Sequence, residues 1–290
     1  MRDGNALWLE SYPYDRMLGL NRRQRTLLLT VLAIILLGTV FFLGIFSGED
    51  KIATNLALRN LPPSWEHPFG TDWLGRDMFI RTMKGLTLSI QIGLLAASAS
   101  ALVSLLLGLA AATLGKWVDE IIAWLIDLFL ALPHLVTLLL ISFTLGGGLK
   151  GIVIGVALTH WPTLARIIRA EVLQLRSADY VQISRKLGKS RWWIATKHIL
   201  PHVIPQFLVG LILLFPHAIL HEASITFLGF GLSPHQPAIG IILSESMRYL
   251  SVGMWWLAFF PGLSLLIIIR TFDVLGENLK LLIDPYNAQE

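Results

Sequence analysis

The sequence contains no cysteine and few charged residues, and each shortage narrows what the protein can be. Without cysteine there is no disulfide, no thiolate metal site and no cysteine nucleophile. Only 14% of the 290 residues are charged, where a soluble globular domain has about a quarter. The mean hydropathy is +0.66, which excludes a soluble globular fold. The net charge of +4 gives no indication of a nucleic-acid partner.

A phosphate-binding loop is also missing. The letters Gly-Lys-Ser at 188–190 end like such a loop, but the pattern requires a glycine at position 183, where Ile183 stands. No Walker motif occurs elsewhere in the sequence. We therefore predict that the chain has no catalytic site and does not hydrolyse ATP itself.

The apolar residues form long runs without Asp, Glu, Lys or Arg. A helix of about 20 residues spans roughly 30 Å, the thickness of a bilayer's hydrocarbon core. The runs therefore predict an all-α membrane protein with about six transmembrane helices. The predicted spans are residues 27–46, 86–114, 121–145, 151–170, 199–222 and 250–271.

A seventh span over 223–244 is an alternative, because that stretch is also free of charge. It contains three glycines and two prolines, which disfavour a continuous helix. We expect an external or re-entrant loop there, since irregular backbone at membrane depth needs protein or water to satisfy it.

The positions of the basic residues predict the orientation. The segment NRRQR at 21–25 precedes the first span and places the N-terminus in the cytoplasm. With six spans, sixteen Lys and Arg lie on the cytoplasmic side and seven outside, so both termini are predicted to be cytoplasmic. The predicted parts are a cytoplasmic segment 1–26, an anchor helix 27–46, an external segment 47–85, a core 86–285 with a cytoplasmic loop 171–198, and a tail 286–290.

The cytoplasmic loop carries the most informative motif. Gly188 lies thirteen residues before Pro201, in a basic and aromatic stretch between two apolar spans. The loop resembles the conserved segment of ABC-importer permeases, usually written E-A-A-x3-G-x9-I-x-L-P. Gly188 and Leu200-Pro201 match, whereas Gln-Ile-Ser at 182–184 replaces Glu-Ala-Ala and His198 replaces Ile. The alternative is an ordinary basic loop on the membrane surface.

Three further segments are similar to one branch of this family, the dipeptide, oligopeptide and nickel permeases. They are HPFGTDWLGRDMFIR at 67–81, HEASITFLGFGLSP at 221–234 and LIDP at 282–285, and ARIIRAEVLQLRSADYV at 165–181 agrees with them. The resemblance covers nearly all of 67–285. Within the first segment, Asp72, Arg76 and Asp77 are expected to pair among themselves.

The resemblance implies a type I ABC importer permease fold in the prokaryotic cytoplasmic (inner) membrane. It also implies a second, homologous permease subunit, two ATPase subunits that use ATP and Mg, and an extracytoplasmic substrate-binding protein. No cofactor is expected on this chain, and membrane lipid surrounds it. The residues expected to couple to the ATPase are Asp179, Tyr180, Arg185, Gly188, Arg191, Leu200 and Pro201.

Histidines give the only indication of the substrate. His217 and His221 are four residues apart, which puts two imidazoles on one helix face as two ligands for a metal ion. With Glu222 they are predicted to line the translocation path, because ionisable groups within a bilayer usually line a path or cavity. The alternative is that they lie in a subunit interface. His134 and His160 are predicted to be packing or helix-bonding residues, and Asp127 to have a structural partner.

These observations favour a permease subunit that moves nickel, another metal ion or a metal chelate, closest in its motifs to the nickel permease subunit of the second (C-type) kind. Import of di- or oligopeptides is the alternative. A secondary transporter is a distant alternative, because Asp127 is the only well-buried acid and no internal repeat is evident.

Overall fold

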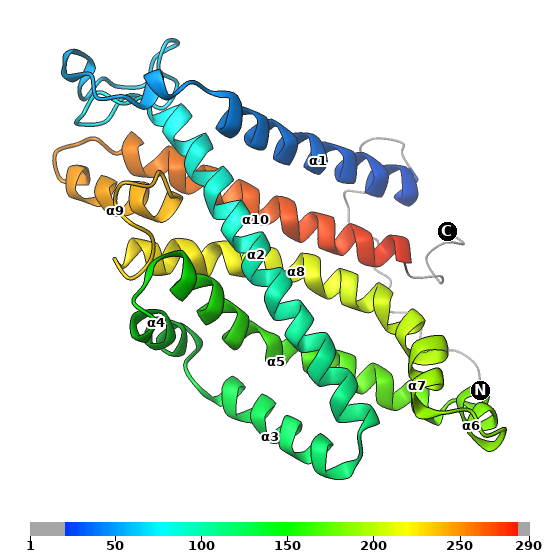
Figure 1. Ribbon diagram of the computed structural model, residues 1–290. Helices are drawn as coiled ribbons and strands as arrows, with labels where there is room; N and C mark the ends of the chain where they lie inside the picture. Colours follow the sequence, from blue (N-terminus) through cyan, green and yellow to red (C-terminus); the bar gives the residue numbers. More distant parts are fainter. Residues whose placement is uncertain (1–20, 284–290) are drawn as a thin grey trace, which may run out of the picture.

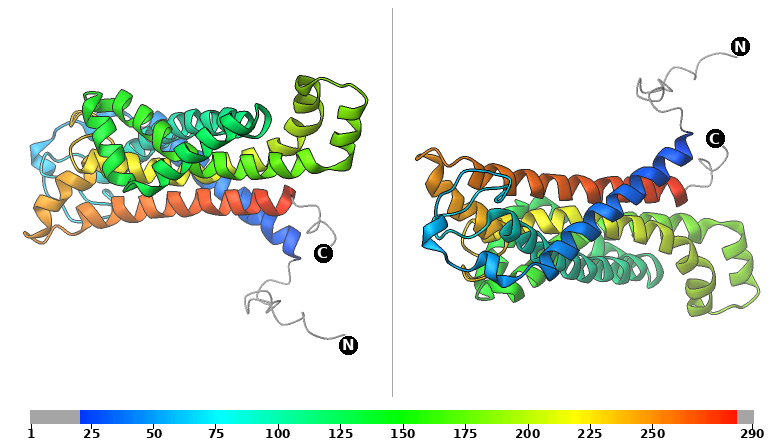
Figure 2. Two further views of the ribbon diagram at one scale, coloured as in Figure 1. Left: turned by 90° about the horizontal axis from the view of Figure 1, so that it is seen from below. Right: turned by 90° about the horizontal axis from the view of Figure 1, so that it is seen from above.

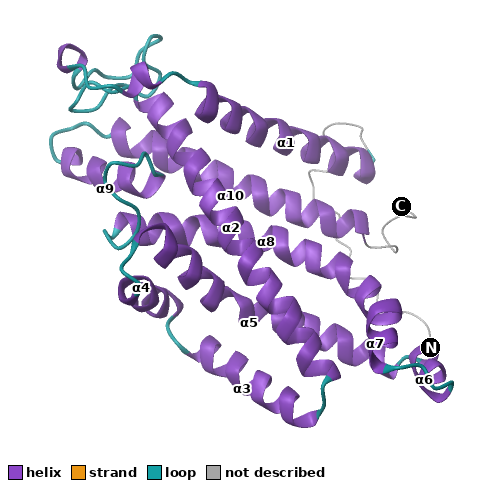
Figure 3. Cartoon of the chain, viewed as in Figure 1, coloured by secondary structure: helices purple, strands orange, loops and turns teal. Residues whose placement is uncertain are grey.

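The computed structural model describes residues 21–283, and these form a bundle of helices with no β-strand among them (Figures 1 and 3). Most of the predicted N-terminal segment and the predicted tail 286–290 lie outside the described residues, as do the last two residues of the L-I-D-P motif. The helices are α1 Arg22–Phe46, α2 Met78–Thr113, α3 Lys116–Ala131, α4 His134–Thr144, α5 Gly148–Ser177, α6 Asp179–Lys186, α7 Arg191–Ile194, α8 Leu200–Phe227, α9 Ile239–Leu250 and α10 Trp256–Ile283.

Five of these helices are long and apolar enough to cross a membrane, and the pair α3 and α4 makes a sixth span if the two are taken together. The number of spans predicted from the apolar runs agrees with this. Helix α2 lies at the centre of the bundle, against α5 and α8, with α1 and α10 on one side and α3 on the other. The start of α1, the end of α10 and the helices α6 and α7 all lie at one end (Figures 1 and 2), as the predicted cytoplasmic location of both termini requires.

The third span is not continuous. Helices α3 and α4 meet at an angle of 98°. Proline has no backbone N–H and disfavours helical geometry in the residue before it, and Leu132 before Pro133 is extended, with φ −80° and ψ 143°. The prediction of one span over 121–145 therefore needs correction to two helices around a proline break.

The second span begins earlier than predicted. Helix α2 starts at Met78 rather than near residue 86, because the Asp77 carboxylate accepts a hydrogen bond from the Ile80 backbone N–H at 2.9 Å and caps the helix. The sequence-based prediction begins this span near residue 86 because Arg81 and Lys84 are charged and the charge-free run starts after them. The external segment therefore covers 47–77.

Residues 223–244 do not form a seventh span. Helix α8 continues to Phe227, an irregular stretch follows, and α9 has 12 residues, too few to cross a bilayer. The irregular stretch lies at the external end, as expected for an external or re-entrant loop.

A charged cluster joins the external segment to α9. The Asp72 side chain is completely buried and accepts hydrogen bonds from Arg76 Nε at 2.6 Å and Arg81 Nη1 at 3.2 Å. Arg81, which is 3% exposed, reaches Glu245 of α9 at 2.5 Å. The predicted pairing of Asp72 with Arg76 is confirmed, but Asp77 pairs instead with His67, at 2.8 Å. We call Asp72, Arg76, Arg81 and Glu245 the external charge cluster.

Two ion pairs hold α3 against α5. Asp127 Oδ1 lies 2.6 Å from Arg166 Nη2, and Asp119 Oδ2 lies 2.8 Å from Arg169 Nη2. Asp127 therefore has a partner, as predicted. Arg166 and Asp127 are both exposed, so the expectation that Asp127 is the only well-buried acid is wrong; Asp72 and Glu222 are the fully buried acids among the described residues.

Candidate functional site

Five of the residues predicted to couple to an ATPase lie on a short helical hairpin that projects from the cytoplasmic end, namely Asp179, Tyr180, Arg185, Gly188 and Arg191. Leu200 and Pro201 lie at the start of α8. Figure 2 shows α6 and α7 beyond the long helices of the bundle. Gly188 connects them with a backbone φ of 77°, a left-handed conformation that glycine adopts at no steric cost. We call residues 179–194 the cytoplasmic hairpin.

The cytoplasmic hairpin presents large apolar side chains to its surroundings. Leu187 is 73% exposed and Trp192 is 78% exposed, with Ile183 exposed beside them on α6. Several large apolar side chains exposed on one short segment indicate a contact with another protein or with lipid.

Two of the four departures from the family pattern contact each other. Ser184 Oγ and His198 Nε2 lie 2.9 Å apart, so the serine in place of alanine and the histidine in place of isoleucine form one hydrogen bond between α6 and the turn that precedes α8. Gln182 donates from Nε2 to the Arg176 backbone carbonyl at 2.7 Å, at the end of α5, whereas Ile183 is exposed. Three of the four departures therefore hold the hairpin by polar bonds.

The chain enters α8 through a π-helical turn, Ala195–Ile199. Tyr180 of α6 packs its ring on His198 of this turn, with centroids 5.4 Å apart. The turn leads directly into Leu200 and Pro201, the first two residues of α8. Single π-turns often occur at functional sites.

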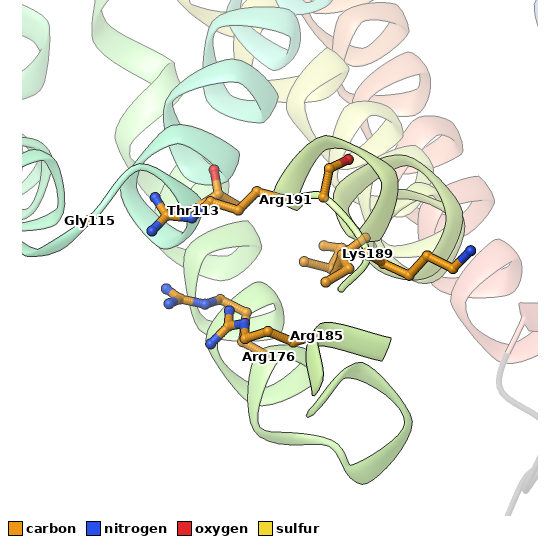
Figure 4. A pocket seen from close by; sticks show the side chains of 9 residues that line it. Thr113, Gly115, Arg176, Arg185, Lys189 and Arg191 are labelled. Atoms are coloured by element: carbon orange, nitrogen blue, oxygen red, sulfur yellow. The ribbon is translucent and has the colours of Figure 1, made fainter. Parts of the chain in front are cut away.

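A basic pocket lies between the cytoplasmic hairpin and the end of α2 (Figure 4). Its volume is about 480 Å³. Figure 4 shows the guanidinium groups of Arg176, Arg185 and Arg191 turned toward the same side, near Thr113, whereas the Lys189 amine points the opposite way. Arg176 also donates to the Ala112 backbone carbonyl in the last turn of α2, where a cation is favourable. The pocket therefore concentrates positive charge and suits an acidic partner.

The structure divides the predicted path residues among different environments. His221 is partly buried, whereas His217, one turn earlier on α8, is exposed. Glu222 is completely buried inside the subunit, and its Oε1 accepts a hydrogen bond from Thr226 Oγ1 at 2.9 Å. The role of these three residues in a path stays a prediction.

His221 lies next to His134 and His160, whereas the sequence paired it with His217. One ring nitrogen from each of His134, His160 and His221 lies within 4.8 Å of the others, and His217 is not part of this group. Among the described residues this is the group of side chains that could hold a metal ion. His160 bonds the Val156 backbone carbonyl one turn earlier in α5, as predicted for a helix-bonding residue. Metal binding by His217 and His221 stays a prediction, and the sequence did not indicate that His134 and His160 lie beside His221. We call these three residues the histidine cluster.

A signal for the missing pair was present in the short loop between α4 and α5. Two helices joined by three residues pack antiparallel, and Gly151 and Gly155 of α5 lie against Ser142 and Leu138 of α4. Continuing this register by one turn places His134 opposite residues 159–160. The spacing of the glycines therefore predicts that His134 lies beside His160, provided that the break between α3 and α4 is recognised first.

Comparisons with known proteins agree on one family. Residues 104–284 match the family described as binding-protein-dependent transport system inner membrane component. A dipeptide transport system permease protein of Bacillus subtilis is 34% identical, with 82% of this chain and 75% of the relative covered. An oligopeptide transport system permease protein of the same organism is also 34% identical, with 93% and 88% covered.

Two more distant similarities complete the comparison. A dipeptide transport system permease protein of Alkalihalophilus pseudofirmus is 31% identical, with 89% of this chain and 86% of the relative covered. A crystal structure of an amino acid ABC transporter with histidines has a TM-score of 0.49 and 20% identity, covering 72% of this chain and 94% of that one.

Proposed function

The chain belongs to the family of binding-protein-dependent transport system inner membrane components, and from this premise we propose that it is one of two permease subunits of an importer of di- or oligopeptides. It is a multi-pass permease component of an ABC importer in the prokaryotic cytoplasmic membrane. Family membership sets aside the alternative of a secondary transporter.

The partners proposed for it are a homologous second permease subunit, two ATPase subunits and an extracytoplasmic binding protein. ATP and Mg would be used by the ATPase subunits, and this chain would bind no cofactor of its own. Transport would proceed by alternating access, in which ATP and substrate favour different members of one equilibrium between inward-open and outward-open states.

The observation that supports this function best is the cytoplasmic hairpin. Its exposed apolar side chains and its turn at Gly188 offer a contact for a soluble ATPase. Because Ser184 of α6 is joined to His198 of the π-helical turn that leads into α8, a displacement of the hairpin would be passed to α8. Helix α8 packs on α2, α5 and α10, so its movement would reach the core of the subunit.

The basic pocket supports an acidic docking face on the ATPase. We expect Arg185→Glu with Arg191→Glu to weaken ATPase binding several-fold and to reduce its dependence on salt, because both guanidinium groups turn toward the pocket. The measurement is co-purification and binding of the ATPase at two ionic strengths. Arg59→Glu, a charge reversal on an exposed residue of the external segment, serves as the control. If the double variant and Arg59→Glu bind the ATPase equally well, the basic pocket is not part of the surface that contacts the ATPase.

The cargo is proposed from the names of the relatives, which are those of dipeptide and oligopeptide permeases. The sequence analysis favoured nickel or a metal chelate because of the histidines, and this becomes the second candidate for the cargo. One observation still supports it, the convergence of three imidazoles in the histidine cluster.

Uptake by the complete reconstituted importer with its own binding protein distinguishes these cargoes. We expect ATP-dependent accumulation of a labelled dipeptide and no ATP-dependent accumulation of labelled nickel, with or without a chelator. A variant of the ATPase that cannot hydrolyse ATP provides the control. Nickel accumulation without peptide accumulation would reverse the assignment of cargo.

A further inference from the structure

The histidine cluster brings together side chains from three helices. His134 is the first residue of α4, His160 lies in α5, and His221 lies toward the external end of α8. The ring centroids are 4.5 Å apart for His134–His160, 4.5 Å for His134–His221 and 5.0 Å for His160–His221. Each imidazole therefore touches both others.

The contacts of His160 favour one tautomer. Its Nδ1 lies 3.1 Å from the Val156 backbone carbonyl oxygen, which can only accept, and the nearby Thr159 hydroxyl, 3.2 Å from the same nitrogen, donates to the Gly155 carbonyl at 2.9 Å, so we assign the proton to Nδ1. Nε2 then holds a lone pair, and it is buried with no hydrogen-bond partner among residues 21–283. A metal-binding histidine is usually held in this way, with its other ring nitrogen donating to a carbonyl or carboxylate.

His221 has the same deficiency. Its Nδ1 is buried and has no hydrogen-bond partner in the described part of the chain. A buried polar atom without a partner destabilises the fold, and core histidines that serve only for packing are normally hydrogen-bonded. Two such nitrogens in one cluster point to a ligand that both would bind.

The neighbouring carboxylate is not part of this cluster. Glu222 follows His221 in the chain and is completely buried, with Oε1 bonded to Thr226 and Oε2 without a partner among residues 21–283, but it does not belong to the group whose ligand atoms lie within 4.8 Å of one another. The cluster therefore offers imidazole nitrogens as its ligands, which suit zinc, cobalt and nickel and do not suit magnesium or calcium.

The helices that carry the cluster are held close together. A methyl group on Gly151 would lie 2.9 Å from the Ser142 carbonyl oxygen, and one on Gly155 would lie 2.9 Å from Leu138 Cδ1. These glycines let α4 approach α5 closely, in the small-xxx-small manner of membrane helices. His134 also stands directly after the proline break between α3 and α4, and broken helices in membrane proteins often border binding sites.

We propose that His134, His160 and His221 bind a divalent transition-metal ion of the zinc, cobalt and nickel class. A tetrahedral ion with bonds of about 2.0–2.1 Å holds neighbouring nitrogens about 3.3 Å apart. The nitrogens lie within 4.8 Å of one another, so rotations that move each ring by about 1 Å complete the site. Three protein ligands leave one coordination position open, for water or a carboxylate oxygen.

The proposal concerns metal binding by the chain itself and holds whether the importer carries peptide or metal. Cobalt is the probe, because four-coordinate Co²⁺ absorbs visible light. The purified permease complex in detergent, carrying an affinity tag without histidine, is titrated with Co²⁺ in the absence of ATP and cargo. We expect one Co²⁺ per copy of this chain, with an absorption band that Zn²⁺ abolishes.

The variants His160→Gln and His221→Gln are expected to lower the Co²⁺ affinity at least 10- to 100-fold, as loss of metal-site residues does. His235→Ala, in the exposed loop between α8 and α9, is the matched control and should bind as the unaltered chain does. Zn²⁺ should raise the thermal unfolding midpoint of the unaltered chain and of His235→Ala, and should leave the midpoint of His160→Gln unchanged.

Absence of the Co²⁺ band in the unaltered chain would overturn the proposal, whatever the variants do. So would equal binding by His160→Gln and His235→Ala. If His160→Gln does not fold, His134→Gln replaces it, because His134 is only partly buried. No peptide transport is measured, so failure of the metal site and failure of the proposed cargo are separate results.

Discussion

Asp72→Ala is expected to destabilise the folded subunit by about 3–5 kcal/mol, because it removes one partner from a buried ion pair. The Asp72 carboxylate also accepts backbone hydrogen bonds from Leu74 at 2.9 Å and from Arg76 at 3.0 Å. Without it, Arg81 would remain 3% exposed with Glu245 as its carboxylate partner. The external segment would then lose one of its attachments to α2, the ion pair of Asp72 with Arg81.

The measurement is the thermal unfolding midpoint of the purified subunit, together with the amount of folded protein recovered from membranes. Glu66→Gln removes an exposed carboxylate from the same segment and is the control. The double variant Asp72→Ala with Arg81→Met should recover part of the loss, since it leaves no unpaired buried charge. A midpoint for Asp72→Ala equal to that of Glu66→Gln would contradict the prediction.

Gly188→Val is expected to leave insertion and folding intact and to reduce ATPase binding and transport about 5- to 150-fold. Gly188 has a φ of 77°, and a β-branched residue there costs about 1–3 kcal/mol. That cost corresponds to this range in a binding equilibrium. No atom lies within 4 Å of the position where a side chain would begin, so the effect would come from the backbone turn and not from a clash.

A matched control exists at the opposite end of the molecule. Gly253 follows α9 with a φ of 88°, and a β-carbon added to it would also have no neighbouring atom within 4 Å. Gly253→Val therefore introduces similar strain in an external turn and should leave ATPase co-purification unchanged. Normal co-purification and transport in Gly188→Val would refute the role of the hairpin turn.

Several features of the fold were predictable because they depend on local composition. The apolar runs indicated the spans, since water and lipid sort side chains by hydropathy over about 20 residues. The ends of the spans were less predictable. Helix α2 begins at Met78, where Asp77 caps it, and Arg81 lies buried in its first turn because it pairs with Asp72 and Glu245. The partner Glu245 is 164 residues away, so this pairing has no local signal.

The cytoplasmic hairpin shows a similar limit. Gly188, Leu200 and Pro201 could be placed from their spacing alone, but Ser184 and His198 looked like two unrelated departures from the family pattern. Their hydrogen bond of 2.9 Å exists because the turn at Gly188 brings α6 back to the π-helical turn before α8. The serine at position 184 is therefore explained by the histidine fourteen residues later, at position 198.

The sequence by itself determined the class of the protein, its number of spans, its orientation and its family, because each of these follows from composition or from motifs in order along the chain. It did not determine which histidines meet. Helical spacing pairs residues on one helix, and so it paired His217 with His221. Contacts between helices depend on the break at Pro133 and on how closely α4 approaches Gly151 and Gly155, and only the tertiary structure fixes these.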